Sequence, residues 1–519
     1  MVALISIMLI GISHTLKNYL NFINKLKAMK VGKHEIILAV IFCLVLTARL
    51  LLAFSSSEFT FESYFSIRQI EHIKETGLPL YHDALSYGGR EYFFPPLFHY
   101  LLAGFSFLIP FFYTLKIIPN IFAASLVLIV YFFSLKLTEN RTVALITCFF
   151  AGFIPIFLAE SLSVSLESFY LPVFFLILYL CVDMTEKNIT IILLLTIVLV
   201  LTSAISIILV ISLLLYLLFT KIEGMSPSKR EVEVVLFSTF LAVWANLILY
   251  KKALIAHNVL IITQNIPTTI ITQFFSNLTF VESFYTIGIV TLLLGLYGIY
   301  YALKTKKKEA FALTSSVATF FVLLLVKLIP LHIGLMFIGI ALVLLSSLAL
   351  KEIMEKLSNV KFTKAPSTFI AFILMLFIGL TILPGLSLTV NTAIPTAEEK
   401  EAWLWLKENS PEDATILASE VEGHAINYYT HRKNVIDTNF LLVRDIDKIV
   451  SDVHTLYATP FLTEALPRLQ LYHISYIMMS PRITEHMNIE KLQYGDARCI
   501  TPVYTTTITI YKVGCDENS

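Results

Sequence analysis

Long apolar stretches recur along most of this chain, and they constrain its fold more than any other feature. A helix needs roughly 20 mostly apolar residues to cross ~30 Å of hydrocarbon, and eleven stretches reach or approach that length. They cover residues 35–54, 117–135, 142–159, 166–182, 189–203, 205–220, 234–250, 284–303, 310–326, 331–350 and 367–387. Only 14% of the 519 residues are charged, against about 25% in soluble proteins. We therefore expect a polytopic α-helical membrane protein.

Three apolar segments are ambiguous. Residues 189–220 fit one kinked helix, or two helices with a tight reversal at Thr202-Ser203-Ala204. Pro96 to Phe112 is apolar enough to suggest a further span. The first dozen residues are too short to span and lack a clear cleavage site, which favours an interfacial helix or an upstream start codon over a signal peptide.

The placement of basic residues predicts the orientation, although the net charge of +1 carries no preference for nucleic acid or acidic partners. Lys and Arg in short loops stay cytoplasmic. Five lysines precede the first span, and alternate later loops are also basic: Lys136, Arg141, Lys187, Lys221, Lys229, Arg230, Lys304, Lys306, Lys307, Lys308, Lys351, Lys356, Lys361 and Lys364. Lys251 and Lys252 are the exception. We expect a cytoplasmic N-terminus and an extracytoplasmic C-terminus.

The alternation of basic loops also decides how we interpret Pro96 to Phe112. If this segment crossed the membrane, every later basic loop would face outward. We therefore interpret it as a helix lying against the outer leaflet within a long first outer loop, about residues 55–114.

Residues 388–519 differ in character from the transmembrane part, residues 1–387. Charged residues return, and strand-like runs such as Ile474 to Met479 and Tyr504 to Val513 alternate with helical stretches. The segment is long enough for its own core, so we expect a mixed α/β domain. Cys499 and Cys515 flank the last strand, and an oxidising compartment would allow a disulfide between them.

Three acidic residues stand out by their position. Glu62 follows the first span by a few residues, while Glu160 and Glu167 bracket the outer ends of the third and fourth spans. Carboxylates at a membrane boundary are costly to desolvate, so they face water, a cation or a substrate. From their placement alone, plain solvation at the interface is the favoured explanation. No metal-type Cys/His spacing and no nucleotide-binding fingerprint accompanies them.

Four stretches resemble one family. Residues 62–83 and the Pro-Pro-Leu at 95–97 are similar to the first outer loop of GT-C membrane glycosyltransferases, and most similar to the catalytic subunit of oligosaccharyltransferase of the archaeal type. That family reads D-x-x-Y-H-x-R where this chain has Glu62, Phe65, Ser66 and Arg68.

The other three stretches follow in the family's order. From Pro155 the chain aligns with a second motif, placing Glu167 at its Asp and Phe169 at its second acid. Residues 263–269 resemble an S-E-x-x-P-T-T loop, with Gln264 in place of the Glu. Residues 419–423 correspond to W-W-D-Y-G, of which only Gly423 matches, which puts recognition of an Asn-x-Ser/Thr acceptor in doubt.

The resemblance implies an inverting glycosyltransferase that moves a sugar or oligosaccharide from a polyprenyl (dolichyl) phosphate or pyrophosphate to a protein or lipid acceptor on the outer face. It implies Glu62 and Glu167 as catalytic residues and as ligands of a divalent metal, Mn²⁺ or Mg²⁺. It also implies substrate-binding roles for Arg68, Gln264, Lys327 and His332.

Other interpretations remain open. Arg68 equally fits an ion pair with Glu71 or Glu62. For Lys327 and His332, plain interfacial positions are favoured over contacts with a lipid phosphate. A monosaccharide transferase of the same fold acting on protein hydroxyls or lipid is a second function, and a non-catalytic scaffold or lipid-binding subunit is a third. Asn277-Leu278-Thr279 matches an N-glycosylation acceptor.

Overall fold

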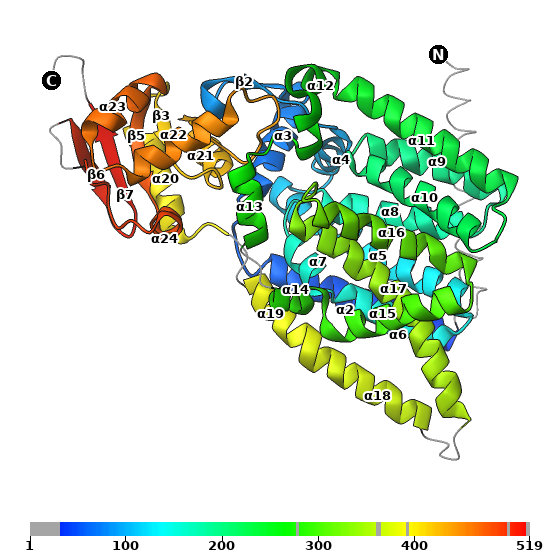
Figure 1. Ribbon diagram of the computed structural model, residues 1–519. Helices are drawn as coiled ribbons and strands as arrows, with labels where there is room; N and C mark the ends of the chain where they lie inside the picture. Colours follow the sequence, from blue (N-terminus) through cyan, green and yellow to red (C-terminus); the bar gives the residue numbers. More distant parts are fainter. Residues whose placement is uncertain (1–31, 277–279, 360–364, 391–393, 496–498, 515–519) are drawn as a thin grey trace, which may run out of the picture.

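The computed structural model describes residues 32–276, 280–359, 365–390, 394–495 and 499–514. A helical bundle fills one part of the molecule, and a C-terminal region containing a sheet lies at one end of it (Figure 1). The bundle helices that correspond to predicted spans are α2 (Lys33–Ala53), α5 (Phe111–Thr138), α6 (Arg141–Gly152) with α7 (Pro155–Glu160), α8 (Glu167–Cys181), α9 (Glu186–Val200), α10 (Ile205–Ile222), α11 (Lys229–Leu249), α14 (Phe280–Ile287) with α15 (Ile289–Lys304), α16 (Lys308–Leu325), α17 (Leu331–Ser358), and α18 (Ala365–Phe377) continued by η3 (Ile378–Ile382) and α19 (Leu383–Val390).

Every predicted span is therefore helical in the structure, and residues 189–220 form two helices. Three spans are interrupted. The break between α6 and α7 falls at Phe153 and Ile154, and the break between α14 and α15 falls at Gly288, whose φ of 94° suits glycine. In the last span, residues 378–382 form a π-helical turn.

Eight helical stretches of the described chain are long and apolar enough to cross a membrane. One of them, residues 251–273, belongs to the segment that we expected outside the membrane. The backbone breaks it at Asn258 and Gln264, both with positive φ, into α12 (Lys251–His257), η2 (Asn258–Thr263) and α13 (Thr268–Ser276). These short pieces do not form one continuous spanning helix.

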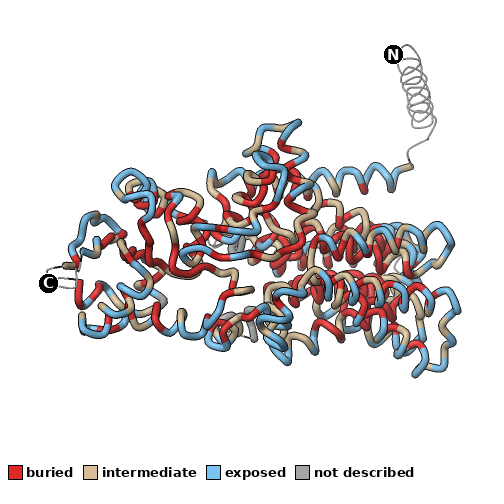
Figure 2. Tube along the Cα trace, turned by 90° about the horizontal axis from the view of Figure 1, so that it is seen from above, coloured by how far each residue is buried: buried red, intermediate tan, exposed pale blue. Residues whose placement is uncertain are grey.

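Helix α17 is the centre of the bundle, and its apolar part is almost entirely buried. Figure 2 shows buried residues running through the middle of the bundle, with exposed residues at its loops. A Cβ on Gly298 of α15 would lie 2.1 Å from the carbonyl oxygen of Leu345 on α17, and one on Gly295 would lie 2.7 Å from that of Leu342. Only glycine permits this approach, as is common between membrane helices.

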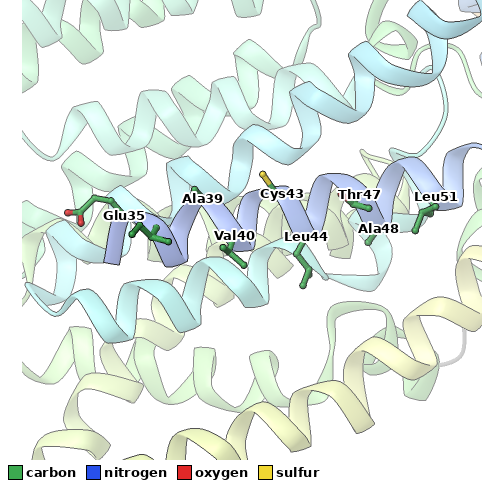
Figure 3. Close-up of a pocket in the computed structure, with 9 residues that line it drawn as sticks. Glu35, Ala39, Val40, Cys43, Leu44, Thr47, Ala48 and Leu51 are labelled. Carbon is green, nitrogen blue, oxygen red and sulfur yellow. The ribbon is translucent and has the colours of Figure 1, made fainter. Parts of the chain in front are cut away.

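Helix α2 lies at the edge of the bundle and keeps an apolar face uncovered. Residues of this face from Glu35 to Leu51, drawn in Figure 3, line an open pocket. Its volume is about 700 Å³. The side chains of Ile36, Val40, Leu44 and Leu51 on this face are exposed. A helix with such a face suits contact with lipid.

The first loop between α2 and α5 contains α3 (Ser63–Thr76), a small hairpin of β1 (His82–Asp83) and β2 (Arg90–Glu91) around the turn η1 (Ser86–Gly88), and α4 (Leu97–Phe105). Helix α4 has nine residues, which is too short to span a membrane. It ends at Phe105, before the predicted end at Phe112, because residues 106–110 turn and α5 begins at Phe111. The first loop therefore ends at residue 110, whereas the predicted end was about residue 114.

The C-terminal region carries a five-stranded sheet of order β4-β3-β5-β7-β6. The strands β3 (Thr415–Leu417), β4 (Lys433–Asn434) and β5 (Ile474–Met479) are parallel, while β6 (Ile500–Thr505) and β7 (Thr509–Val513) form an antiparallel hairpin. The predicted strand at 474–479 is confirmed. The predicted strand at 504–513 is wrong in part, because residues 506–508 turn between β6 and β7.

Helices α20 (Ala397–Asn409), α21 (Gly423–Thr430), α22 (Ile446–Ala458), α23 (Leu462–Leu471) and α24 (Pro481–Met487) accompany the sheet. Cys499 is disulfide-bonded; Cys515, its expected partner, lies outside the described residues. The boundary predicted at residue 388 falls within α19 and stays a prediction.

Buried polar contacts fasten the C-terminal region to the first loop. The carboxylate of Asp437, fully buried, accepts hydrogen bonds from Ser86 Oγ at 2.6 Å and Tyr92 Oη at 3.2 Å. The side chain of Asn434 accepts one from the Tyr87 N–H at 2.8 Å. Such contacts fix the loop against the region, so the two parts form one continuous surface on this end of the bundle.

Candidate active site

Three carboxylates and one imidazole come together at the end of the bundle that carries the C-terminal region. Glu62 interacts electrostatically with His332 and Glu160. Glu160 also interacts with Glu167, and Glu167 interacts with both Glu62 and His332. Glu62 directly precedes α3, and Glu160 is the last residue of α7. Glu167 is the first residue of α8, and His332 is the second residue of α17. We call them the carboxylate cluster.

The cluster is open to water although protein surrounds it. Glu62 and Glu160 are exposed, and Glu167 is partly exposed. Burial nevertheless raises the pKa of Glu62; the nearby Glu160 adds to this effect and His332 opposes it. Glu62 is therefore accessible to water and is at the same time desolvated in part by the protein around it. This environment suits a carboxylate that exchanges a proton with a ligand.

The loop between α7 and α8 joins the acids. Ser63, next to Glu62, donates to Ser163 Oγ at 2.8 Å, and the Thr60 N–H donates to the same oxygen at 3.3 Å. The residues flanking Glu62 are therefore attached to the loop that separates Glu160 from Glu167.

Phe169 occupies the position of the family's second acid, and its ring is packed among other aromatic rings. Its centroid lies 5.0 Å from that of Phe122 and 6.3 Å from that of Phe98. Phe169 is partly buried, and an acid at its position would lie among aromatic rings, where a charge without a partner is costly. Glu160, from α7, instead supplies the third carboxylate of the cluster.

Arg68 forms a buried bidentate ion pair with Asp83. Its Nη1 lies 2.7 Å from Oδ2 and its Nη2 lies 2.9 Å from Oδ1, and Asp83 is only 1% exposed. The alternative of a structural ion pair is therefore realised, but with Asp83 in place of Glu71 or Glu62. The chain turns back through Gly77, whose φ of 79° ends α3, and brings Asp83 alongside α3. The pair connects α3 to β1.

The two remaining residues named for substrate binding lie apart from these contacts. Gln264 is exposed at a left-handed turn after η2, while its neighbour Asn265 donates to the carbonyl oxygens of Phe440 and Val443 at 3.0 and 2.9 Å. Lys327 is exposed between α16 and α17, with its Nζ 5.5 Å from the ring centroid of Phe275. Among the described residues, no hydrogen bond joins either side chain to the carboxylate cluster.

The described part of the chain contains no group of three or more His, Cys, Asp and Glu side chains placed to hold one metal ion. Mg²⁺, however, is commonly held by one or two carboxylates and completed by waters and substrate phosphates. Glu62 and Glu167 fit that mode, because both offer oxygen ligands and a cation would relieve the repulsion between them. Asn277, Leu278 and Thr279 of the predicted glycosylation acceptor lie outside the described residues.

Sequence reasoning identified Glu62, Glu167 and His332, and the structure brings these three together. Glu160 was noticed only for its position at a span end. Its association with Glu62 depends on the break between α6 and α7, for which Pro155 is the one visible sequence signal.

This arrangement of helices, with a long first loop and a C-terminal region packed over one end of the bundle, is the fold of GT-C membrane glycosyltransferases. Archaeal oligosaccharyltransferase AglB from Archaeoglobus fulgidus, solved with an inhibitory peptide and a dolichol-phosphate, matches with a TM-score of 0.68 and 14% identity over 87% of this chain and 69% of AglB. The Archaeoglobus fulgidus oligosaccharyltransferase solved with Zn and sulfate matches at 0.61 and 15%, over 85% and 68%.

ArnT from Cupriavidus metallidurans, bound to undecaprenyl phosphate, matches with a TM-score of 0.52 and 11% identity over 92% of this chain and 98% of ArnT. No protein-family model and no curated protein sequence matches the chain. At these identities the comparisons establish the fold, and with it a multi-pass membrane protein.

Proposed function

We propose that this protein is an inverting membrane glycosyltransferase that moves a sugar or oligosaccharide from a polyprenyl phosphate or pyrophosphate to an acceptor on the outer face. The observation that carries the proposal is the electrostatic association of Glu62, Glu167 and His332 at one end of a GT-C fold, with Glu62 exposed to water. The solved relatives bind dolichol-phosphate and undecaprenyl phosphate, which supports a donor of this class.

The reaction needs a base for the nucleophile and stabilisation of the leaving group. The acceptor atom forms a bond to the anomeric carbon, the bond from that carbon to the phosphate oxygen breaks, and its electron pair departs with the phosphate. Glu62 orients the acceptor and takes its proton, a role that suits a carboxylate whose pKa burial raises. A divalent metal held by Glu62 and Glu167 would supply charge stabilisation to the phosphate.

The basic residues have separate roles in this proposal. His332 interacts electrostatically with Glu62 and Glu167 and contacts the phosphate of the donor. Lys327, exposed four residues before α17, meets the charged head of the lipid at the bundle end, and Gln264 contacts the acceptor from its exposed turn. Arg68 supports α3 through Asp83 and acts on the substrate only through the position of this helix.

A monosaccharide transferase acting on protein hydroxyls or lipid is the second candidate. The observation that favours it is the state of residues 419–423, where the family's acceptor-binding signature would lie. Glu422 is fully buried, and its Oε2 accepts hydrogen bonds from the Ser419 hydroxyl at 2.6 Å and backbone N–H at 3.2 Å. The segment bonds to itself and offers little of the open aromatic surface that the signature would supply.

The test is transfer by the purified full-length protein from synthetic polyprenyl-phosphate and polyprenyl-pyrophosphate sugars, each with a sequon peptide and a serine-rich peptide. Glu62→Gln and Glu167→Gln should each lower transfer by about 10²–10⁴-fold. Glu91→Gln is the control, since Glu91 is an exposed carboxylate of the same loop. Transfer that survives both substitutions would overturn the assignment. Absence of transfer, with stabilisation of the protein by polyprenyl phosphate, would favour a lipid-binding scaffold.

A further inference from the structure

A fully buried arginine lies near the end of α2 that faces the carboxylate cluster. Arg49 is 1% exposed, and the hydrogen bonds of its guanidinium go to neutral groups. Its Nε donates to Asn120 Oδ1 at 3.1 Å, and its Nη2 donates to the carbonyl oxygen of Ser161 at 2.8 Å and to the Ser161 hydroxyl at 2.6 Å. Its guanidinium carbon also lies 5.2 Å from the ring centroid of Phe157. A charge inside a membrane helix is costly, so its retention calls for a specific use.

Asn120, on α5, binds Leu162, which follows Ser161 in the loop between α7 and α8. Its Nδ2 donates to the carbonyl oxygen of Leu162 at 2.9 Å and to that of Lys116, within α5, also at 2.9 Å. Asn120 is fully buried as well. Two spanning helices therefore bind two consecutive backbone carbonyls of the loop between α7 and α8.

The first loop holds the two residues that follow. Ser63 Oγ donates to Ser163 Oγ at 2.8 Å and lies 3.2 Å from the carbonyl oxygen of Val164. Residues 161–164 thus form a segment in which every residue is bound by a side chain from another element; we call it the anchored loop. Glu160 precedes it directly, Glu167 begins the helix after it, and Glu62 adjoins Ser63 in the sequence.

We propose that Arg49 is a positioning residue for the transfer reaction: by binding Ser161 and Asn120 it sets the anchored loop so that Glu160 and Glu167 face Glu62. The inference rests on the proposed function for its effect on catalysis, but its geometric part stands on the contacts of Arg49 alone. A displacement of about 1 Å between reacting groups costs roughly 10²-fold in rate. A purely structural arginine would affect folding and activity together, whereas a positioning residue changes the rate of a folded protein.

The kinetic test uses Arg49→Lys, Arg49→Met and Ser161→Ala, with Ser134→Ala as control. Ser134 is a buried serine of α5 whose hydroxyl has no hydrogen-bond partner in the described structure. We expect Arg49→Met to lower kcat by about 10–100-fold with little change in KM. Arg49→Lys should recover part of kcat, because an ammonium reaches one acceptor but lacks the planar fork that binds Ser161 and Asn120 together. Equal losses of activity and heat stability in all three variants would overturn the proposal.

A second measurement does not depend on activity. In a Cys43→Ser background, Ser63→Cys with Ser163→Cys places two thiols where the hydroxyls lie 2.8 Å apart. Copper-phenanthroline should close this disulfide several-fold more slowly when Arg49→Met is added, because the loop is no longer fixed. An unchanged rate would overturn the positioning role. If the rate depends on Arg49 but the wild-type protein transfers no sugar, the proposed function fails and the geometric inference stands.

Discussion

Lys400 Nζ, on α20, donates a hydrogen bond to Glu58 Oε1 at 2.7 Å and so ties the C-terminal region to the first loop. The other oxygen, Oε2, accepts hydrogen bonds from Tyr64 at 3.0 Å and from Tyr429. One carboxylate thus receives donors from α3, α20 and α21. Glu58 lies four residues before Glu62 in the same loop, so this segment connects the docking of the C-terminal region to the carboxylate cluster.

We expect the Glu58 contact to fail in acid. Burial alone would raise the pKa of Glu58, but the hydrogen bonds from Lys400, Tyr429 and Tyr64 outweigh burial and hold the pKa below its ordinary value. A lowered folded-state pKa gives stability that is complete above the unfolded value of about 4.3 and is lost as pH falls through the folded value. Glu58→Gln should cost about 1 kcal/mol at neutral pH, a small figure because Lys400 is partly exposed.

Heat-denaturation midpoints of wild type and Glu58→Gln, measured from pH 7 down to pH 3, check this prediction. The difference between the two proteins should shrink below pH ~4. A constant difference across the range would contradict the assignment of the effect to the ionised carboxylate.

The acid limb of the pH profile of kcat/KM should move along the pH axis in opposite directions in two variants. Burial and Glu160 raise the pKa of Glu62, while His332 lowers it. If the ionised Glu62 is the base, the rate falls as pH drops through this pKa. His332→Gln should therefore move the acid limb of kcat/KM to higher pH, and Glu160→Gln should move it to lower pH. Shifts of the same sign in both variants would rule out Glu62 as the titrating group.

Removing one partner of the Arg68–Asp83 pair should destabilise the protein strongly. Each of Arg68→Met and Asp83→Leu leaves a buried charge without its counter-charge, at a cost of roughly 3–5 kcal/mol. The double variant should lose much less than the sum, because neither charge remains. A double-mutant cycle on the free energy of unfolding measures this coupling. Additive losses would mean that Arg68 has a different main partner, such as the substrate.

Gly298→Ala should disturb the packing of α15 on α17, because a Cβ there would lie 2.1 Å from the carbonyl oxygen of Leu345. We expect a loss of about 1–3 kcal/mol in the free energy of unfolding, typical of overpacking. Gly104→Ala in α4 is the matched control, since nothing lies within 4 Å of the Cβ that it would add. Equal stability of both variants, compared by heat denaturation in detergent, would contradict the close approach of the two helices.

The orientation predicted from the basic loops can be tested in intact cells. In a Cys43→Ser background, a membrane-impermeant maleimide should label Glu412→Cys, an exposed position after α20, and leave Thr305→Cys, an exposed position after α15, unlabelled until the cells are opened. The reverse pattern would place the C-terminal region and the carboxylate cluster on the cytoplasmic side.

The spans could be predicted from the sequence because apolar length is a local property, and all eleven predicted spans are helical. The interruptions of these spans were harder to predict. The break at Gly288 and the π-helical turn at 378–382 depend on contacts with neighbouring helices. Glu62 and Glu167 were recognisable because carboxylates near membrane boundaries are rare. The partner of Arg68 could not be recognised from the sequence. The turn at Gly77 and the loop after it decide which acid lies alongside α3.

The anchored loop has a mechanical consequence. Arg49, Asn120 and Ser63 bind four consecutive residues between Glu160 and Glu167, so both acids are attached to the same anchored segment. When the helices of the bundle or the C-terminal region move slightly, Glu160 and Glu167 move together with this segment. The distance between them then changes little. In the proposed reaction, the separations between the carboxylates would therefore be set before an acceptor binds.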